Sequence, residues 1–446
     1  MLPTAAQTAA PNQSSTPAPT GFWERSNPLG NIGGLRPALQ NVGGTFNLQE
    51  ISEILGNVTG GIRTGADYDG LTTASLNLDT SKAFQWSGGT FDVSALQIHG
   101  RNLSTDSLAT LQTASGIEAS RATRLWELWY QQAFLGGKAD VKLGQQSVDQ
   151  EFIVSQYAGL FVNTMMGWPM LPSADLYAGG PAYPLSSPGV RLRVQPSNAL
   201  TALFGVFDDN PPGGPFNDDP QLRGAEASGT EFNLGSGALW IGELQYSANA
   251  SPAKDCGKLA CGLPGTFKLG GWYDSGSFLD QRFDTSGVSL ASPASNGLAL
   301  RHRGNFSIYG VIDQMVWREP DGPRSVGIFA RGMGAPADRN LIDASLNAGV
   351  NVKAPLPGRD NDTVGVGSGW AHVSGRASAL DQDTAHFTGA AFPVRVAEHF
   401  VEVTYQYQLA PWWQLQPDFQ YVINPGGGIR NPQHTSLIVG DEAVFG

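Results

Sequence analysis

The chain of 446 residues contains 57 Gly and 29 Pro, with only 15% charged and 41% hydrophobic residues, a composition poor in helix formers and rich in turn residues. Because no run of about 18 apolar residues exists, a membrane-spanning helix is excluded. The net charge of −12, without any cluster of Lys or Arg, argues against nucleic acid as a partner.

Residues 1–30 are predicted to be a flexible N-terminal segment. The stretch MLPTAAQTAAPNQSSTPAPT is rich in Ala, Pro, Thr and Ser and has neither a basic region nor an apolar core. This composition is typical of a mature terminus from which an export signal has been cleaved, with Met1 as an addition. Residues 31–446 are predicted to form a single domain that begins with a short helical or coil segment.

A two-residue alternation of polar and apolar side chains, which is the period of a strand and not of a helix, recurs along the chain. In LWELWYQQAF (125–134) the polar side carries Glu127 and Trp129 and the apolar side carries Trp126 and Leu128. In GVRLRV (189–194) the polar side carries Arg191 and Arg193. The alternation continues in ALWIGELQYSA (238–248), TFKLGGWYDSG (266–276), NFSIYGVIDQMVW (305–317) and SVGIFARGMG (325–334), whose polar faces carry Glu243, Lys268, Trp272, Asp313 and Arg331. This pattern predicts about fifteen strands of roughly ten residues, the length that a tilted strand needs to cross a bilayer.

The segments between the predicted strands alternate between short and long. Short corners occur at Gly136-Gly137, Pro196-Ser197-Asn198 and Ala410-Pro411, and long loops are expected at 149–187, 208–236, 274–303 and 334–362. Aromatic residues such as Phe134, Trp412 and Trp413 stand beside the short corners, as in an interfacial girdle. Short periplasmic turns and long extracellular loops are typical of an outer-membrane β-barrel.

The segment EFIVSQYAGLFVNTMMGWPMLPSADLYAGGPAYPLSSP, residues 151–188, is too apolar, aromatic and Pro-rich for a freely solvated loop. One hypothesis is that part of it folds into the lumen of the barrel and narrows the pore. Packing between subunits is the alternative, and the sequence leaves a monomer and a homotrimer equally open.

The two cysteines, Cys256 and Cys261 in DCGKLAC, stand in a Gly- and Lys-containing segment. A small disulfide that closes this loop is preferred over free thiols, and it would imply an oxidising compartment. Two thiols cannot complete a four-ligand zinc site, so no metal is predicted.

Paired carboxylates raise the possibility of an enzyme or a calcium loop. Asp208-Asp209 and the pair Asp360 and Asp362 have the residue type for a glycosidase, but neither pair has the spacing of an EF-hand. Turns explain both pairs. The sequence contains no GxSxG, no HExxH and no phosphate loop, and its six histidines are scattered, so neither an enzyme nor a cofactor is predicted.

The stretch FVEVTYQYQLAPWWQLQPDFQYVINPGGG, residues 400–428, shows the alternation most clearly. Its polar parity consists of Glu402, Thr404, Gln406, Gln408, Gln414, Gln416, Asp418 and Gln420, and the other parity is Val, Leu and aromatic. A secreted β-sandwich or β-solenoid would carry more Lys and Glu on its solvent faces and would have shorter strands. Strands in lipid must close on themselves, and closure favours an even count, so the predicted fold is an all-β barrel of about sixteen antiparallel strands.

Four motifs, RLWELWYQQAF, GVRLRV, YGVIDQMVW and above all VTYQYQLAPWWQLQPDFQYVINPGGG, resemble the carbohydrate-selective porin family of the OprB type, and the likeness extends from residue 31 to the end. The resemblance implies a barrel in the bacterial outer membrane, surrounded by its lipid, that passes monosaccharides such as glucose by diffusion without catalysis. Two departures occur. The family's Trp-Gly-Gly-x-Arg element reads NIGGLRPALQ here, with Ile32 in place of Trp and with Arg36 retained. The chain stops at DEAVFG, so the closing strand is expected to be cut short.

We expect the apolar parity to face lipid and the polar parity to line a water-filled lumen. Amides offer donors and acceptors that exchange with sugar hydroxyls, Arg forks bridge adjacent hydroxyls, and an inward Trp offers a flat face to a pyranose ring. The predicted substrate path comprises Arg36, Glu127, Trp129, Arg191, Arg193, Glu243, Asp313, Glu402, Gln416 and Asp418. The alternative is that these charges pair across the wall and that an inward Trp packs beneath a folded-in loop.

Three functions therefore remain after the sequence alone. A sugar-selective diffusion channel is preferred, a general diffusion porin for small solutes is the second reading, and a surface carbohydrate-binding adhesin is the third. An adhesin would need polar strand faces on the outside of the barrel. The sequence leaves open which sugar or polyol permeates.

Overall fold

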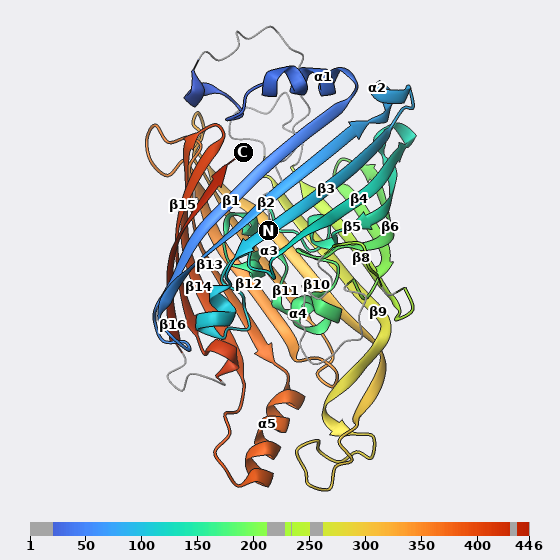
Figure 1. Cartoon of the computed structure of the whole chain (residues 1–446), viewed down its shortest axis with the longest axis vertical. Helices are drawn as coiled ribbons and strands as arrows, with labels where there is room; N and C mark the ends of the chain where they lie inside the picture. Colours follow the sequence, from blue (N-terminus) through green and yellow to red (C-terminus); the bar gives the residue numbers. More distant parts are fainter. Residues whose placement is uncertain (1–20, 212–227, 233, 250–261, 429–434, 446) are drawn as a thin grey trace.

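The computed structural model describes residues 21–211, 228–232, 234–249, 262–428 and 435–445. Within these ranges sixteen antiparallel strands form one closed barrel, in which each strand pairs with its neighbours in chain order (Figure 1). The strands are β1 (Gly44–Thr59), β2 (Gly65–Asp79), β3 (Gly89–Gly100), β4 (Ala122–Phe134), β5 (Ala139–Gln146), β6 (Ser187–Ser197), β7 (Leu200–Asp208), β8 (Ala238–Ala248), β9 (Gly265–Asp284), β10 (Ala299–Arg318), β11 (Ser325–Gly334), β12 (Ile342–Lys353), β13 (Thr363–Val373), β14 (Ala397–Ala410), β15 (Trp413–Ile423) and β16 (Thr435–Phe445). The predicted all-β barrel is confirmed.

The helices are short and lie at the two ends of the barrel or within it (Figure 1). They are α1 (Leu35–Asn41), α2 (Thr80–Phe84), α3 (Thr164–Gly167), α4 (Met170–Asp175) and α5 (Gly375–Thr388). Single turns are η1 (Phe22–Glu24), η2 (Ile32–Gly34), η3 (Ser104–Leu108), η4 (Leu135–Gly137), η5 (Val148–Gln150), η6 (Ala158–Leu160), η7 (Tyr177–Gly179) and η8 (Pro425–Gly427). Among the described residues, no helix has the length and apolarity that crossing a membrane requires.

The wall has an apolar outer face and a polar inner face. In β14, Val401 and Val403 are 39% and 41% exposed, whereas Glu402 and Thr404 are 0% and 1% exposed. Because successive side chains of a strand point to opposite faces, the Val parity faces lipid and the Glu and Thr parity faces the interior. The predicted assignment of faces is confirmed for this strand.

A β-bulge in β4 changes the face of one aromatic residue. The pairing of β3 with β4 skips Trp126, which is 5% exposed and packs with its ring centre 6.4 Å from that of Tyr183. Leu128, two residues later, is 50% exposed on the outside. The prediction that Trp126 and Leu128 share the outer face is wrong, since the extra residue reverses the alternation between them.

The predicted bounds of the loops at 274–303 and 334–362 are wrong. The first interval contains the ends of β9 and β10, which leave only residues 285–298 between them, and the second contains the whole of β12. The β12 sequence IDASLNAGVNVK is rich in Ala, Asn and Gly, which are weak strand formers, so its alternation was hard to recognise. Loop 374–396, with α5, lies opposite the short corners at the lower end in Figure 1, whereas loop 147–186 turns inward among the strands.

The last strand closes the barrel. β16 pairs with β15 from Thr435 to Phe445, and on its other side with β1, where Glu50 lies opposite Phe445. A closing strand with a partner along both edges is therefore present, and its expected shortening stays a prediction.

The N-terminal segment reaches across to the other end of the chain. Trp23 stacks at 5.9 Å and 6.2 Å on Trp412 and Trp413 beside the β14–β15 corner, and Trp412 Nε1 donates to the carbonyl oxygen of Phe22 at 3.2 Å. We call the side chains of Phe22, Trp23, Trp412 and Trp413 the aromatic clasp. Residues 1–20 of the predicted flexible segment, and both cysteines of the predicted disulfide, lie outside the described residues.

Candidate pore constriction

Loop L3, residues 147–186 between β5 and β6, lies inside the barrel, where α3 and α4 are seen within the ring of strands (Figure 1). Its side chains Phe152, Met166 and Leu171 are at most 1% exposed, and they form one apolar cluster with wall residues such as Phe329 and Phe400. The hypothesis that this segment folds into the lumen is confirmed.

Glycine in the wall makes room for L3. A Cβ on Gly367 of β13 would lie 2.8 Å from both Phe161 Cε1 and Met166 Cε. A Cβ on Gly327 of β11 would lie 2.3 Å from the ring of Tyr157. Both distances are shorter than side-chain contacts allow, so at these positions L3 lies directly against the backbone of the wall.

Carboxylates of the wall accept hydrogen bonds from L3. Asp313 of β10 accepts from the Ser155 hydroxyl at 2.5 Å and from the backbone N–H of Gln156 at 3.0 Å. Glu243 of β8 accepts from the N–H of Ile153 at 2.8 Å. The same kind of contact joins Glu402 to the N–H groups of Val162 (2.5 Å) and Asn163 (3.2 Å), and Glu127 to that of Ser147 (2.9 Å). Four of the predicted lumen carboxylates thus hold the loop by accepting hydrogen bonds from its backbone N–H groups and from one hydroxyl.

Wall donors bind the carbonyl groups of the same loop. The Arg331 side chain of β11 is 1% exposed and donates from Nη2 to the carbonyls of Met165 at 2.6 Å and Met166 at 3.0 Å. Its Nη1 donates to those of Ile153 at 3.0 Å and Gly167 at 2.9 Å. These four bonds satisfy polar backbone groups that would otherwise be buried without partners.

Two amides and a lysine act in the same way. Predicted lumen residue Gln416 donates to the carbonyl of Leu160 at 2.7 Å, and Lys268 donates to that of Val154 at 2.7 Å. Asn351 donates to the carbonyl of Tyr157, also at 2.7 Å. The wall therefore fixes L3 from β8 round to β15.

Loop L2, residues 101–121 between β3 and β4, completes the filling of the lumen. Glu398 of β14 accepts from the N–H groups of Leu111 at 2.8 Å and Gln112 at 2.7 Å. L2 also touches L3, because the N–H of Thr164 donates to the carbonyl of Thr113 at 3.1 Å. The two loops form one body against the wall.

Glu118 of L2 carries a perturbed carboxyl group. Burial, together with the charge of Asp69, raises its pKa to about 8, and the hydrogen bond that it accepts from the N–H of Ser104 at 3.3 Å only partly offsets this. Glu118 is therefore mostly protonated at neutral pH.

A charged cluster on β5 and β6 faces the start of L3. Arg191 and Arg193 both bind Asp140, the latter through Nε at 2.5 Å, and Glu151 binds Arg191 Nε at 2.6 Å and Lys142 Nζ at 2.9 Å. The side chains of Arg193 and Glu151 are 29% and 24% exposed, whereas those of Arg191 and Asp140 are 4% and 0% exposed. Arg193 and Glu151 are thus the members of these two ion pairs whose side chains remain partly exposed.

The neighbours of Glu151 keep it charged. Burial alone would raise its pKa, but the positive charges of Lys142 and Arg191 outweigh burial and hold the pKa below the usual glutamate value. Lys142 Nζ also lies 4.2 Å from the ring centre of Trp129. One face of the Trp129 ring therefore carries a cation, so that face is not open to a sugar ring.

Three further predicted residues lie away from the exposed cluster. Arg36 lies in α1 beyond the strand ends and donates to the carbonyl of Phe46 at 3.3 Å, so its predicted place in the lumen is wrong. Asp418 is 4% exposed and accepts from Gln420 at 3.0 Å. Trp272 is 3% exposed in the cluster beneath L3, which is the alternative that the sequence left open.

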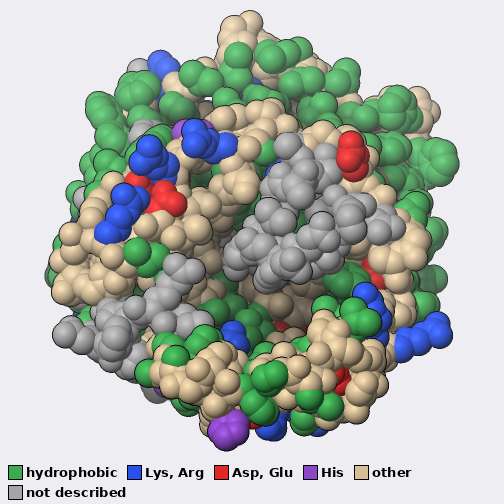
Figure 2. All heavy atoms as spheres, turned by 60° about the horizontal axis from the view of Figure 1, so that its bottom comes forward, with side chains coloured by type: hydrophobic (Ala, Val, Ile, Leu, Met, Phe, Trp, Pro, Cys, Tyr) green, Lys and Arg blue, Asp and Glu red, His purple; other side chains and the backbone are tan. Residues whose placement is uncertain are grey.

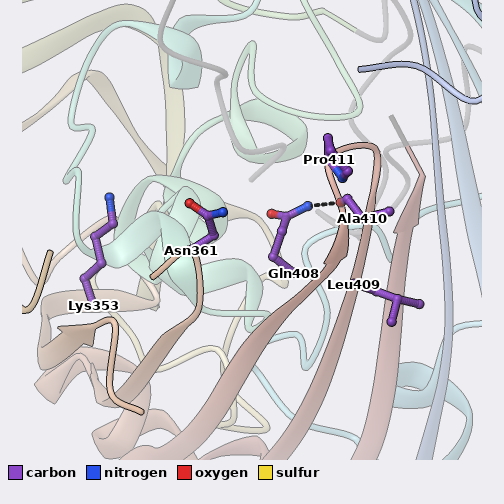
Figure 3. Close-up of a pocket in the computed structure, with 6 residues that line it drawn as sticks. All are labelled: Lys353, Asn361, Gln408, Leu409, Ala410 and Pro411. Atoms are coloured by element: carbon purple, nitrogen blue, oxygen red, sulfur yellow. Dashed lines mark hydrogen bonds between the residues drawn. The ribbon is translucent and has the colours of Figure 1, made fainter. Parts of the chain in front are cut away.

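A cavity of about 480 Å³ opens at the corner end of β12 to β15. Figure 3 shows Lys353, Asn361 and Gln408 pointing into a common space, while Leu409 points away from it. The amides of Gln408 and Gln414 bond each other at 2.7 Å on the same wall. This mouth has polar groups suited to hydroxylated solutes. No group of three or more His, Cys, Asp or Glu in the described ranges is placed to hold a metal ion.

The predicted substrate path does not include Asp140, Lys142 or Glu151. Asp140 and Lys142 are on the polar parity of ADVKLGQQ, directly opposite Arg193 and Arg191 in the register of β5 with β6. That alternation was a usable signal. Glu151 has no such signal, because it lies within L3, where no regular alternation exists.

Comparison with known proteins places this architecture in a family. The profile of the carbohydrate-selective porin, OprB family, matches residues 63–446. Porin B of Pseudomonas aeruginosa is 24% identical over 419 residues, covering 90% of this chain and 87% of the relative, and the putative porin QuiX of Acinetobacter baylyi is 23% identical over 429 residues, covering 91% and 90%.

Solved structures agree in fold. The high-pH structure of Pseudomonas putida OprB superposes with a TM-score of 0.81 at 22% identity, covering 95% of this chain and 99% of that one. The low-pH structure of the same protein gives 0.57 at 17% identity, with 95% and 98% coverage. The chain, with its sixteen strands and its family match over most of its length, belongs to the OprB family of carbohydrate-selective porins.

Proposed function

We propose that this sugar-selective outer-membrane channel passes monosaccharides by passive diffusion, and that its narrowest passage runs along the β5–β6 wall beside the start of L3. The observation that carries the proposal is the fixed position of L3 inside the lumen, with Arg193 and Glu151 left partly exposed. Because L3 occupies part of the lumen, we expect a disaccharide to pass more slowly than glucose.

The exposed pair supplies complementary groups for a sugar. The guanidinium of Arg193 is a planar fork that donates to two neighbouring hydroxyl oxygens, and the Glu151 carboxylate accepts from a third hydroxyl. Binding of this kind is exchangeable, which a conducting pore requires. A zwitterionic amino acid would instead form charge-assisted pairs with both groups, and we expect these stronger contacts to hold it longer than neutral hydroxyl contacts hold a sugar.

Liposome swelling tests the proposal. The purified protein should admit glucose faster than a disaccharide and faster than an amino acid of similar size. Arg193→Gln should bring the glucose rate down to that of the amino acid. The control Arg318→Gln changes an exposed Arg at the C-terminal end of β10 and should leave the preference for glucose intact. Equal glucose and amino-acid rates in the unmodified protein would favour a general diffusion pore. Rapid passage of the disaccharide would refute the size limit.

A further inference from the structure

Two arginines lie on the outer surface of the barrel, at the end opposite the short corners. In β9 and β10, Arg301 pairs with Leu279 and His302 pairs with Phe278. The Phe278 ring stacks at 5.1 Å on Tyr177 of L3, so Phe278 and His302 face inward. Arg301, on the opposite parity, therefore faces outward with Leu279, and Arg303 shares its side.

The position of these arginines along the membrane normal follows from the apolar band on the same strand. Outward-facing residues of β10 are large and exposed from Phe306 (51%) through Ile308 (69%) and Ile312 (43%) to Trp317 (45%). The steps from Phe306 to Trp317, at about 3.3 Å each and tilted by about 40°, span roughly 28 Å, close to the apolar band of about 25 Å of such barrels. Arg303 thus lies just beyond the hydrocarbon edge, at the level of the lipid headgroups.

Both guanidinium groups are exposed, and neither forms an ion pair within the described ranges. The carboxylates around them are already occupied: Asp280 binds His302 at 2.9 Å, and Asp338 binds Arg339 at 2.8 Å. Among the described residues, these two positive charges on the outer face therefore have no carboxylate partner. Figure 2 shows Lys and Arg side chains gathered with a few acidic ones along one edge of this end of the molecule.

We propose that Arg301 and Arg303 bind a phosphate group of a phosphorylated glycolipid in the outer leaflet. Guanidinium forks recognise phosphate oxygens in two-point contacts, and anionic lipid attracts basic residues at the membrane surface. Exposed Tyr273, which pairs with Phe306 immediately below, adds a phenolic hydroxyl at the same level. The acyl chains of that lipid would lie along Phe306 and Ile308.

The test uses the full-length protein in nanodiscs, titrated with a diphosphorylated lipid A and with its dephosphorylated form, and followed by native mass spectrometry. Arg301→Gln/Arg303→Gln should bind the phosphorylated lipid at least about tenfold more weakly, since each arginine contributes a contact at the membrane surface. Arg318→Gln, on the same strand in the other leaflet, should bind normally. Both variants should keep the heat-modifiable folded band and glucose swelling, which separates this site from the pore.

Equal binding of the phosphorylated lipid by the double variant and the unmodified protein would overturn the proposal. So would equal binding of the two lipid forms. Inorganic phosphate at the same concentration should not displace the lipid, because the proposed site also uses the apolar band. Displacement by inorganic phosphate would show a free-anion site instead and would refute the lipid assignment.

Discussion

Arg331 Nη2 lies 2.6 Å from the carbonyl oxygen of Met165, so a side chain of the wall holds the backbone of L3 where that loop is buried. The same guanidinium binds three more carbonyls of the loop. A planar group with five N–H donors suits this task, because L3 presents several carbonyls toward one point of the wall.

Replacing Arg331 should enlarge the pore. Arg331→Met leaves four buried carbonyls without donors and should lower the free energy of unfolding by on the order of 3 kcal/mol. With L3 loosened, the swelling rate of a disaccharide should rise relative to glucose. Arg331→Lys, which keeps the charge but not the fork, should give an intermediate ratio. An unchanged ratio in a folded Arg331→Lys barrel would show that Arg331 supports stability alone.

Replacing one acceptor oxygen of Asp313 should weaken the attachment of L3 to the wall. Asp313→Asn places an amide N–H₂ against either the Ser155 hydroxyl or the N–H of Gln156, and it should lower the free energy of unfolding by about 1–3 kcal/mol. Single-channel recordings should show added current noise as the loop detaches. Asp360→Asn, at an exposed turn position between β12 and β13, is the matched control and should change neither quantity.

The attachment of L2 should weaken as the pH rises. Glu118 has a pKa of about 8 in the folded protein against 4.5 when unperturbed, so its neutral form favours folding. Its contribution is complete below pH 4.5 and is lost as the pH rises through about 8. The unfolding temperature of the folded barrel at pH 6 and at pH 9 measures this loss, and Glu118→Gln should reduce the difference between the two temperatures. The control Glu319→Gln should leave that difference unchanged. A slope that survives Glu118→Gln would assign it to other carboxyls.

The aromatic clasp should contribute to stability and not to selectivity. Trp23→Ala removes two stacking contacts, each worth about 0.5–1.5 kcal/mol beyond buried area, and should lower the unfolding temperature. The preference for glucose in liposome swelling should stay the same. Trp86→Ala, at a ring that is 62% exposed near the same end, is a control that should have a smaller thermal effect.

Alternation predicted the barrel and the faces of its strands, because a period of two residues is a local property that lipid and water enforce on every strand. It failed where that period breaks, at the bulge beside Trp126, and where the side chains are small, as in β12. Alternation also placed Glu243, Asp313 and Glu402 inward correctly. It could not reveal that they bind L3, since hydrogen bonds between residues more than eighty positions apart leave no periodic trace. The apolar composition of L3 was the available signal.

The pairing of Glu50 with Phe445 joins the first strand to the last. This contact has almost the largest sequence separation that the chain allows. The entropic cost of closing the ring is therefore offset only when the final strand pairs with β1 and β15. Until then the outer edges of β1 and β15 expose unpaired amide groups that lipid cannot satisfy. Insertion should therefore depend on the C-terminal strand more than on any other, and a protein that halts before β16 should present two adhesive edges to neighbouring chains.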